Sequence, residues 1–269
     1  MIINTNTLSL NAHRNMGTNT AKLGKASEKL SSGLRVNRAA DDAAGLAVSE
    51  TMRSQIRGLN QANRNVQDGI SYAQTAEGAL DEVSAMLTRV KELLVQASTG
   101  TYTEQDRTSI EEELKALGLE MTNIITSTKF NGLAITSGAT VATGHDGSLA
   151  ITIPAVTVGL VSGTTDAIRD INDSIGAAAK AAVSILEDGI ELVSTQRAKI
   201  GAVQNRLEHT LQNQKVTVEN VTTSESRIRD TDMASEMMNF TKFNVLNQAA
   251  QSMMAQANQI PNQALGLLG

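Results

Sequence analysis

The stretch LSSGLRVNRAADDAAGLAVSETMRSQIRGL, residues 30–59, separates two helical patterns of different quality. Before it, apolar residues are sparse and mixed with Asn and Thr, whereas after Gly58 a strict seven-residue repeat begins. Gly33 interrupts the first pattern, so we expect the first helix to end there. Its first half holds a short cluster of charged side chains, those of Arg35, Arg38, Asp41 and Asp42. It is therefore the expected junction between two helical regions.

The residues before this junction form a weak heptad repeat. Its members are three larger apolar residues seven apart and two alanines between them, namely Met16, Leu23, Leu30, Ala12 and Ala26. Residues 4–7, Asn-Thr-Asn-Thr, offer side-chain oxygens for an N-cap. So narrow an apolar stripe buries little surface, and we expect this helix to need a partner.

The residues after the junction form an unbroken heptad repeat. One position of the repeat holds Leu59, Val66, Ala73, Leu80, Leu87 and Leu94, and the other holds Ala62, Gly69, Ala76, Val83, Val90 and Ala97. Extended back to Gly45, the pattern predicts one helix of roughly 80 Å at 1.5 Å per residue. Further apolar residues at Ile56, Ile70, Met86 and Leu93 widen the buried face. More than one partner helix must therefore pack on it.

Two more helices are expected in the middle of the chain. Residues 99–102 break the long helix, and Thr103, followed by acidic residues, is a predicted N-cap for a helix that runs to about Thr128. The short break predicts an antiparallel helical hairpin. Apolar residues spaced by three and four resume at Ile168 and continue to Val221, which predicts a second long helix that packs on the first.

The middle of the chain, residues 136–164, is expected to be a small β-hairpin and loop region. Asn131-Gly132 is a turn signal. Alternating apolar residues predict strands at 149–153 and 156–160, and the Gly-rich stretch before them is expected to be a loop. The fold class is therefore mainly α: a long, antiparallel, coiled-coil-like bundle from paired N- and C-terminal halves, with a small β-hairpin region in the middle.

The last stretch, from Met233, has helical periodicity but loses its charge. No ionisable side chain occurs in residues 244–269, which are rich in Asn, Gln, Ser and Met. A helix of this composition is poorly suited to a solvated surface. We expect it to be buried by copies of itself or by a partner.

Composition excludes several classes of protein. The 269 residues include three Phe, two Tyr, no Trp and two Pro, which suits long packed helices better than an enzyme core built around aromatics. Without Cys, the chain has no disulfide, thiolate nucleophile or Cys-ligated zinc. The net charge of −5 disfavours nucleic-acid binding. We expect no cleaved signal peptide and no membrane span.

Side chains that could carry catalysis are scattered. The three histidines, His13, His145 and His209, do not form a metal-binding motif, and no phosphate-binding loop follows a strand. The adjacent Asp41 and Asp42 are more simply surface or hinge charges than an acid and base pair. We therefore expect no enzymatic activity, no metal site and no cofactor.

Four stretches resemble those of bacterial flagellins: INTNTLSLNAHRNM, LSSGLRVNRAADDAAGLAVSE, RVKELLVQAS and NQIPNQALGLLG. The resemblance covers residues 1–135 and 165–269. The chain lacks a large central outer domain, so it resembles a short form of the family.

The resemblance implies a structural subunit that polymerises into the helical filament of the bacterial flagellum, which serves motility. It implies three parts: residues 1–33 and 231–269 as a terminal helical pair in the inner layer, residues 34–135 and 165–230 as a long-helix bundle with a connecting spoke at 31–45, and residues 136–164 as the hairpin region. The implied location is the extracellular filament, reached by type III export.

The resemblance also implies site residues and partners. The polymerisation helices carry Met16, Leu23, Leu30, Phe243, Leu246, Met253 and Ile260. The spoke is expected to carry intersubunit charges at Arg35, Arg38, Asp41 and Asp42. A surface for the Toll-like receptor for flagellin matches Arg89, Leu93, Gln96 and Glu113, with Leu93 at the edge of the apolar face. A NAIP-type inflammasome receptor would read Leu265, Leu267 and Leu268. Further implied partners are hook-associated and cap proteins, the export chaperone and the type III apparatus.

Two other interpretations compete with a filament subunit. A hook-filament junction protein, which belongs to the hook-associated proteins, shares the terminal helices but normally has larger central β domains. A soluble helical adaptor, or an enzyme built on a helical bundle, is the other class.

Overall fold

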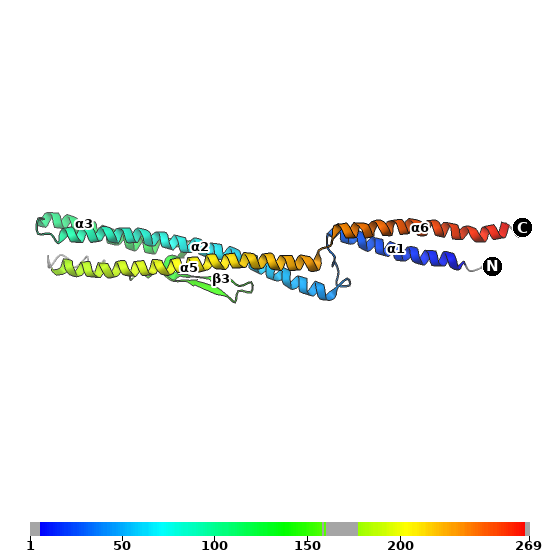
Figure 1. Cartoon of the computed structure of the whole chain (residues 1–269). Coiled ribbons are helices and arrows are strands. Elements are labelled where there is room, and N and C mark those ends of the chain that lie inside the picture. The colour runs from blue at the N-terminus through cyan, green and yellow to red at the C-terminus, as the bar shows by residue number, and fades with distance from the viewer. Residues whose placement is uncertain (1–5, 158, 160–176, 267–269) are drawn as a thin grey trace. The chain divides into compact units, whose positions relative to one another are not determined.

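The computed structural model describes residues 6–157, 159 and 177–266 and is mainly helical, as predicted (Figure 1). Its elements in chain order are α1 (Thr7–Ser32), α2 (Ala43–Ala97), α3 (Glu104–Ser127), β1 (Lys129–Phe130), β2 (Leu133–Ala134), the 3₁₀ helix η1 (Ile135–Ser137), β3 (Ala139–Ala142), β4 (Ala150–Ile153), α5 (Ala177–Arg229) and α6 (Met233–Gly266). They form two compact units, one of Met1–Ser54 with Asn220–Gly269 and the other of Gln55–Glu219. No described helix is long and apolar enough to cross a membrane.

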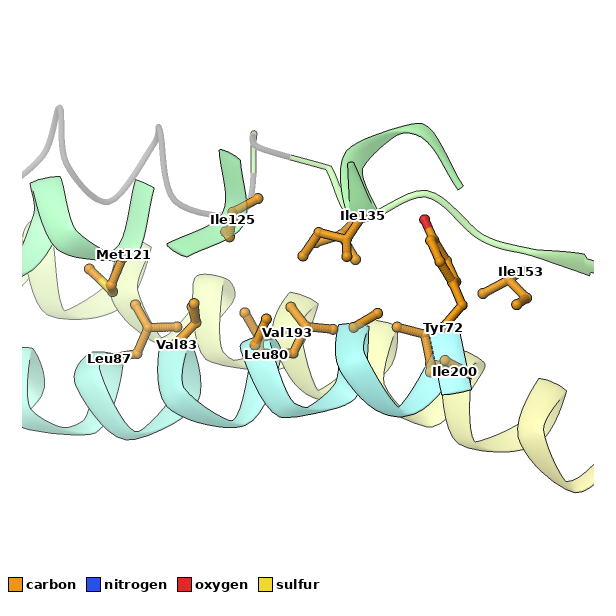
Figure 2. Packing of buried hydrophobic residues seen from close by; sticks show 14 of the residues in the cluster. Tyr72, Leu80, Val83, Leu87, Met121, Ile125, Ile135, Ile153, Val193 and Ile200 are labelled. Carbon is orange, nitrogen blue, oxygen red and sulfur yellow. The ribbon is translucent and has the colours of Figure 1, made fainter. Parts of the chain in front are cut away.

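The core of the unit Gln55–Glu219 lies between α2, α3 and α5. The heptad positions on α2 that were predicted to face partners are buried from Ala62 to Leu94. Figure 2 shows Leu80, Val83 and Leu87 of α2 facing residues of the other two helices, namely Met121, Ile125, Val193 and Ile200. The two long helices, of 55 and 53 residues, are nearly equal in length. The predicted packing of a second long helix on the first is therefore confirmed.

Helix α3 begins as the sequence indicates. The Thr103 hydroxyl accepts a hydrogen bond from the backbone N–H of Asp106, and the Asp106 carboxylate accepts one from the backbone N–H of Thr103. The Thr103 hydroxyl also donates to the Asp106 carboxylate, and this bond, together with the one from the Thr103 backbone N–H, holds the pKa of Asp106 below its ordinary value. The reciprocal capping satisfies two backbone donors at the start of the helix.

The β region differs from the prediction in its strands. Asn131 and Gly132 form the predicted tight turn, with φ of 49° and 81°, between the paired β1 and β2. However, β4 pairs with β3, and β3 lies in the stretch that was expected to be a loop. The expected strand at 156–160 is wrong where it can be judged, because Val156 is buried coil. Val158 and Leu160 lie outside the described residues, as does the expected start of the second long helix at Ile168.

Side-chain amides of α5 attach the β region to the bundle. Gln196 donates to the backbone carbonyl of Ala155 at 2.8 Å, and Gln214 donates to the carbonyl of Thr143. From the other side, the Tyr72 hydroxyl of α2 donates to the carbonyl of Ala134. Both glutamines are buried, so these amide N–H groups find their acceptors within the protein. The hairpin region is thus fixed to α2 and α5.

In the other unit, α1 and α6 lie side by side and antiparallel (Figure 1). The Asn6 amide donates to the carbonyl of Ala257, and the Asn247 amide donates to the Thr20 hydroxyl at 3.2 Å. The Lys22 ammonium lies 5.7 Å from the centre of the Phe243 ring. The pairing of the terminal halves that the sequence predicted is therefore confirmed.

The contact surface between α1 and α6, called the seam below, buries few large apolar side chains. On α1 the residues predicted for the heptad repeat face α6, but of these only Ala26 is buried and the others are half-buried. Ser9 and Asn19 fall at further positions of the same repeat and are also half-buried. On α6 the half-buried or buried residues also recur every seven residues, namely Glu236, Phe243, Ala250 and Ala257, with Phe240, Asn247 and Met254 between them. Small and polar residues therefore take many of the places that Leu and Val fill in the bundle core.

Candidate functional site

The paired helices α1 and α6 leave apolar side chains facing solvent. Of the predicted polymerisation residues, Met16, Leu23, Leu30 and Phe243 lie half-buried in the seam. Leu246 and Met253, in contrast, are 40% and 60% exposed. The side chain of Ile260 lies outside the described residues. On α6 an apolar groove follows the helix, lined by Met237, Met238, Thr241, Lys242, Val245 and Leu246.

The junction loop between α1 and α2 is tied to the end of α5. Helix α1 ends at Gly33, whose φ of 72° suits a residue without a side chain, and its N–H bonds to the carbonyl of Lys29. Leu34 pairs with Asp230 in a short antiparallel bridge. Arg35 donates from its backbone to Arg229 and from its guanidinium to the carbonyl of Ile228. The loop therefore starts in a fixed position.

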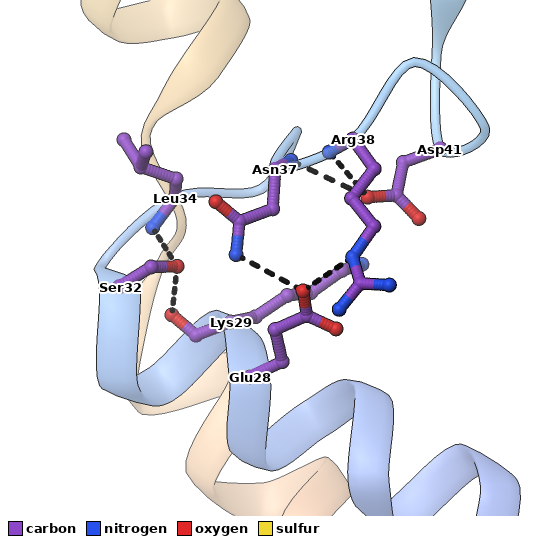
Figure 3. A network of polar contacts seen from close by, with 7 residues as sticks. All are labelled: Glu28, Lys29, Ser32, Leu34, Asn37, Arg38 and Asp41. Carbon is purple, nitrogen blue, oxygen red and sulfur yellow. Dashed lines mark hydrogen bonds and ion pairs between the residues drawn. The ribbon is translucent and has the colours of Figure 1, made fainter.

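The other predicted spoke charges have partners within the chain. Figure 3 shows Arg38 donating to the Glu28 carboxylate at 2.8 Å, while Asp41 accepts the backbone N–H groups of Arg38 and Asn37. The hydrogen bond from the Arg38 backbone lowers the pKa of the Asp41 carboxyl, and that from Asn37 adds to it. Asp42 accepts the N–H of Gly45 and so caps α2. These charges already shape the loop of a single subunit.

Sequence reasoning missed the ion pairs that join the start of α2 to the end of α5. Arg229 is 9% exposed and donates to the Glu50 carboxylate at 2.6 Å, and Arg53 donates to Glu225 at 2.7 Å. Arg229 lies in the last turn of its helix, where a basic residue suits the helix dipole. That position is the one sequence signal that could have singled it out.

The predicted receptor surface joins α2 to α3. The Arg89 guanidinium contacts the Glu113 carboxylate at 3.1 Å and that of Glu92 at 3.2 Å, and the hydrogen bond that Arg89 donates to Glu113 raises the pKa of Arg89. Gln96 donates to the Tyr102 hydroxyl at 3.0 Å. Arg89, Gln96 and Glu113 thus lie on the surface.

The predicted place of Leu93 at the edge of the apolar face is wrong. Leu93 is 2% exposed and belongs to the bundle core. The apolar face of α2 is as wide as the sequence pattern indicates, and the core that α2 forms with α3 and α5 includes Leu93. The C-terminal residues Leu267 and Leu268 lie outside the described residues, as does the side chain of Leu265.

Two histidines line one cavity beside the tip of the hairpin. His145 and His209 border a space of about 440 Å³ together with Thr143, Asn213 and Gln214. Within the described part of the chain, no group of three His, Cys, Asp or Glu is placed to hold a metal ion. His13 lies exposed on α1, in the other unit.

Comparison with known proteins agrees with this architecture. The family described as the bacterial flagellin N-terminal helical region matches residues 3–140, and that of the C-terminal helical region matches residues 183–268. The chain is 50% identical to a flagellin of Halalkalibacterium halodurans and 45% identical to a flagellin of Bacillus subtilis, in both cases over the whole of both chains.

Two further comparisons extend this picture. A flagellar filament core protein of Treponema maltophilum is 43% identical over the whole of both chains. A solved structure from Vibrio parahaemolyticus, provisionally assigned as a flagellar hook-associated protein, matches 71% of this chain and all of its own with a TM-score of 0.60; at 13% identity, it shows a shared fold alone. From the full-length relatives and the two matched helical regions, the chain belongs to the bacterial flagellin family, the structural subunits of the flagellar filament.

Proposed function

We propose that this filament subunit polymerises through the faces of α1 and α6 that a single chain leaves open. One observation carries the proposal: large apolar side chains stay exposed along both helices, among them Leu8, Leu10, Met238 and Val245. Exposed apolar surface of this kind does not stabilise a monomer, whereas helical head-to-tail packing of identical copies buries it. Residues 1–33 and 231–269 then form the inner layer of the filament.

The partial burial of the seam between α1 and α6 suggests when these helices become ordered during assembly. A half-buried heptad with polar members gains little from pairing alone, so the terminal helices become fully ordered only when neighbouring copies cover them. Amide exchange on monomer and filament tests this. Residues 240–260 should be protected much more strongly in the filament, and equal protection in both would contradict the proposal.

The spoke charges are proposed to serve neighbours as well as their own loop. Arg35, Arg38 and Asp41 remain largely exposed after making their intrachain bonds, and Asp42 is half-exposed. Replacing Arg35 by Glu should impair filament growth while the fold of residues 45–225, followed by amide exchange of those residues, is unchanged. Loss of both filament growth and the fold would assign the spoke to the bundle core instead.

The proposal also divides the chain into parts. Residues 31–45 connect the terminal pair to a bundle of residues 34–135 and 165–230, with residues 136–164 as its hairpin region.

Membership of the bacterial flagellin family supports proposals for further binding partners. We propose that the chain leaves the cell by flagellar type III export without a cleaved signal peptide, and that it meets hook-associated and cap proteins in the assembled flagellum. An export chaperone would bind the C-terminal amphipathic helix in a groove. A chain truncated at Ile228 should therefore lose the chaperone in a pull-down, whereas the full chain should retain it.

Two immune receptors are proposed to read the subunit. The Toll-like receptor for flagellin would contact Arg89, Gln96 and Glu113, with Leu93 acting beneath them by holding α2 in place. Arg89→Glu should weaken binding to this receptor, whereas Arg64→Glu, which changes another exposed arginine of α2, should not. Equal binding of all three proteins would contradict the assignment. The NAIP-type receptor would read Leu265, Leu267 and Leu268.

A purely structural role completes the proposal, with no catalytic activity and no cofactor. Electron microscopy of seeded polymerisation separates it from the alternatives. Long helical filaments support a filament subunit. Short caps or junctions on added filaments would favour a hook-filament junction protein, and a product that remains monomeric would favour a helical adaptor.

A further inference from the structure

Half of the methionines in this chain lie on one helix. The sequence has ten Met and no Cys, so oxidation of sulfur in this protein falls on Met. Five of the ten belong to α6, namely Met233, Met237, Met238, Met253 and Met254. Only Met254 takes a position in the seam with α1.

The other four are open to solvent in the single chain. Their side chains are between 48% and 69% exposed, with Met238 the most exposed, whereas Met121 in the bundle core is 0% exposed. Met237 and Met238 line the apolar groove of α6 beside Val245 and Leu246. Since these are the surfaces that assembly is proposed to bury, the thioethers are accessible before assembly and covered after it.

We propose that Met233, Met237, Met238 and Met253 are oxidation sites of the unassembled subunit, and that their conversion to methionine sulfoxide by a hydroperoxide blocks filament growth. The inference rests on the proposed function of α6. In each step the thioether sulfur attacks a peroxide oxygen, the O–O bond breaks and an S–O bond forms. Sulfur loses two electrons, and hydrogen peroxide is reduced to water.

The block follows from the polarity of the product. A sulfoxide is a strong hydrogen-bond acceptor, and burying an acceptor without a donor carries a large desolvation penalty. Lys242 is the single charged donor at the groove. Residues 244–269 offer only neutral donors, from Asn, Gln and Ser, whose hydrogen bonds offset less of that penalty than a charged donor would. Each buried sulfoxide should therefore lower the equilibrium constant for subunit addition by about tenfold.

The first experiment uses the full chain and hydrogen peroxide. Mass spectrometry should find the four α6 sites oxidised well before Met121. Sedimentation of seeded polymerisation should show a loss of at least about tenfold in filament yield, with helix content by circular dichroism unchanged. In preformed filaments the same four residues should oxidise at least about tenfold more slowly than in the monomer, because they are covered.

Matched variants identify the residues responsible. A chain with Met→Leu at positions 233, 237, 238 and 253 should polymerise after peroxide treatment, because Leu is similar in volume and does not oxidise. Met121→Leu should remain as sensitive as the unchanged chain. If the fourfold variant does not polymerise even before treatment, repair of the oxidised unchanged chain by methionine sulfoxide reductases should restore filament growth.

The outcomes separate this inference from the proposed function. Oxidised subunits that polymerise at the untreated yield, a fourfold variant that remains peroxide-sensitive, a reductase-treated chain that stays inactive, or a general loss of helix content would each overturn the oxidation switch alone. Failure of the untreated chain to polymerise would overturn the proposed function, and this inference with it.

Discussion

The bundle of α2, α3 and α5 and the pair of α1 and α6 use the same heptad spacing with opposite results. In the bundle, Leu80 and Leu87 are fully buried at their heptad positions. In the terminal pair, residues such as Asn19 and Asn247 occupy the equivalent heptad positions, and their side chains are only half-buried. A seven-residue period thus selects which face of a helix pairs, but the size and polarity of the residues decide whether the pair is stable alone.

The largest expected effect comes from truncating the bundle core. Leu80→Ala should lower the free energy of unfolding of the unit Gln55–Glu219 by about 2–5 kcal/mol, because it removes buried methyl groups and leaves a cavity among α2, α3 and α5. Chemical denaturation followed by circular dichroism measures this. A loss below about 1 kcal/mol would mean that the bundle is as loosely packed as the terminal pair.

A smaller effect is expected where the β region approaches α2. A side chain at Gly58 would clash with the backbone carbonyl of His145, so Gly58→Ala should displace the hairpin tip and destabilise the unit by about 1–3 kcal/mol. Gly78→Ala is the matched control on the same helix, since a Cβ there meets nothing within 4 Å. It should stabilise by about 0.5–1 kcal/mol. Equal effects at both positions would show that helix propensity, not hairpin contact, dominates.

In the terminal pair the same type of truncation should matter little to the monomer. Leu23→Ala removes a half-buried side chain, and its cost to the single chain should be about 1 kcal/mol or less. The yield of seeded polymerisation should fall much more clearly, because neighbouring copies complete the burial. If monomer stability and polymerisation are both unaffected, Leu23 does not belong to the assembly surface.

The smallest effect is a pH dependence of the junction loop. Hydrogen bonds from the backbone N–H groups of Arg38 and Asn37 hold the pKa of Asp41 below its ordinary value of 3.8. Because the folded pKa is the lower one, the stabilisation is present above that ordinary value and is lost as pH falls through the folded pKa. NMR titration should therefore show the loop around Asn37 changing below about pH 3.8. In Asp41→Asn this acid step should be absent.

Much of the helical architecture could be predicted from the sequence. Gly33 ends α1, Thr103 caps α3, and Asn131-Gly132 forms the first hairpin turn, because each is a local signal whose partner lies within a few residues. Strand β3 could not be predicted, because its residues Ala139–Ala142 look like loop until β4 supplies a hydrogen-bonding partner. Strand identity here depends on contact with another segment.

The site residues divide in the same way. The terminal heptad residues follow from periodicity, and the structure places Met16 and Leu23 in the seam. The burial of Leu93 depends on how much of α2 its partners cover, and the Arg229–Glu50 ion pair joins residues 179 positions apart. The local pattern indicates only that Leu93 belongs to the wide apolar face and that Arg229 suits the end of a helix, and it names the partners of neither. The functions proposed for these surfaces remain predictions.

The two glutamines that hold the β region have a consequence for how this chain can change in length. Gln196 and Gln214 are separated by 18 residues on α5, which is five helical turns, so their amides emerge from one side of the helix about 27 Å apart. One residue added between them would turn the second amide by about 100° and detach one end of the hairpin region. Residues inserted at the hairpin tip, around Gly147, do not change the spacing of the two glutamines on α5. Natural length variation is therefore expected to collect at the tip, while α5 keeps its register.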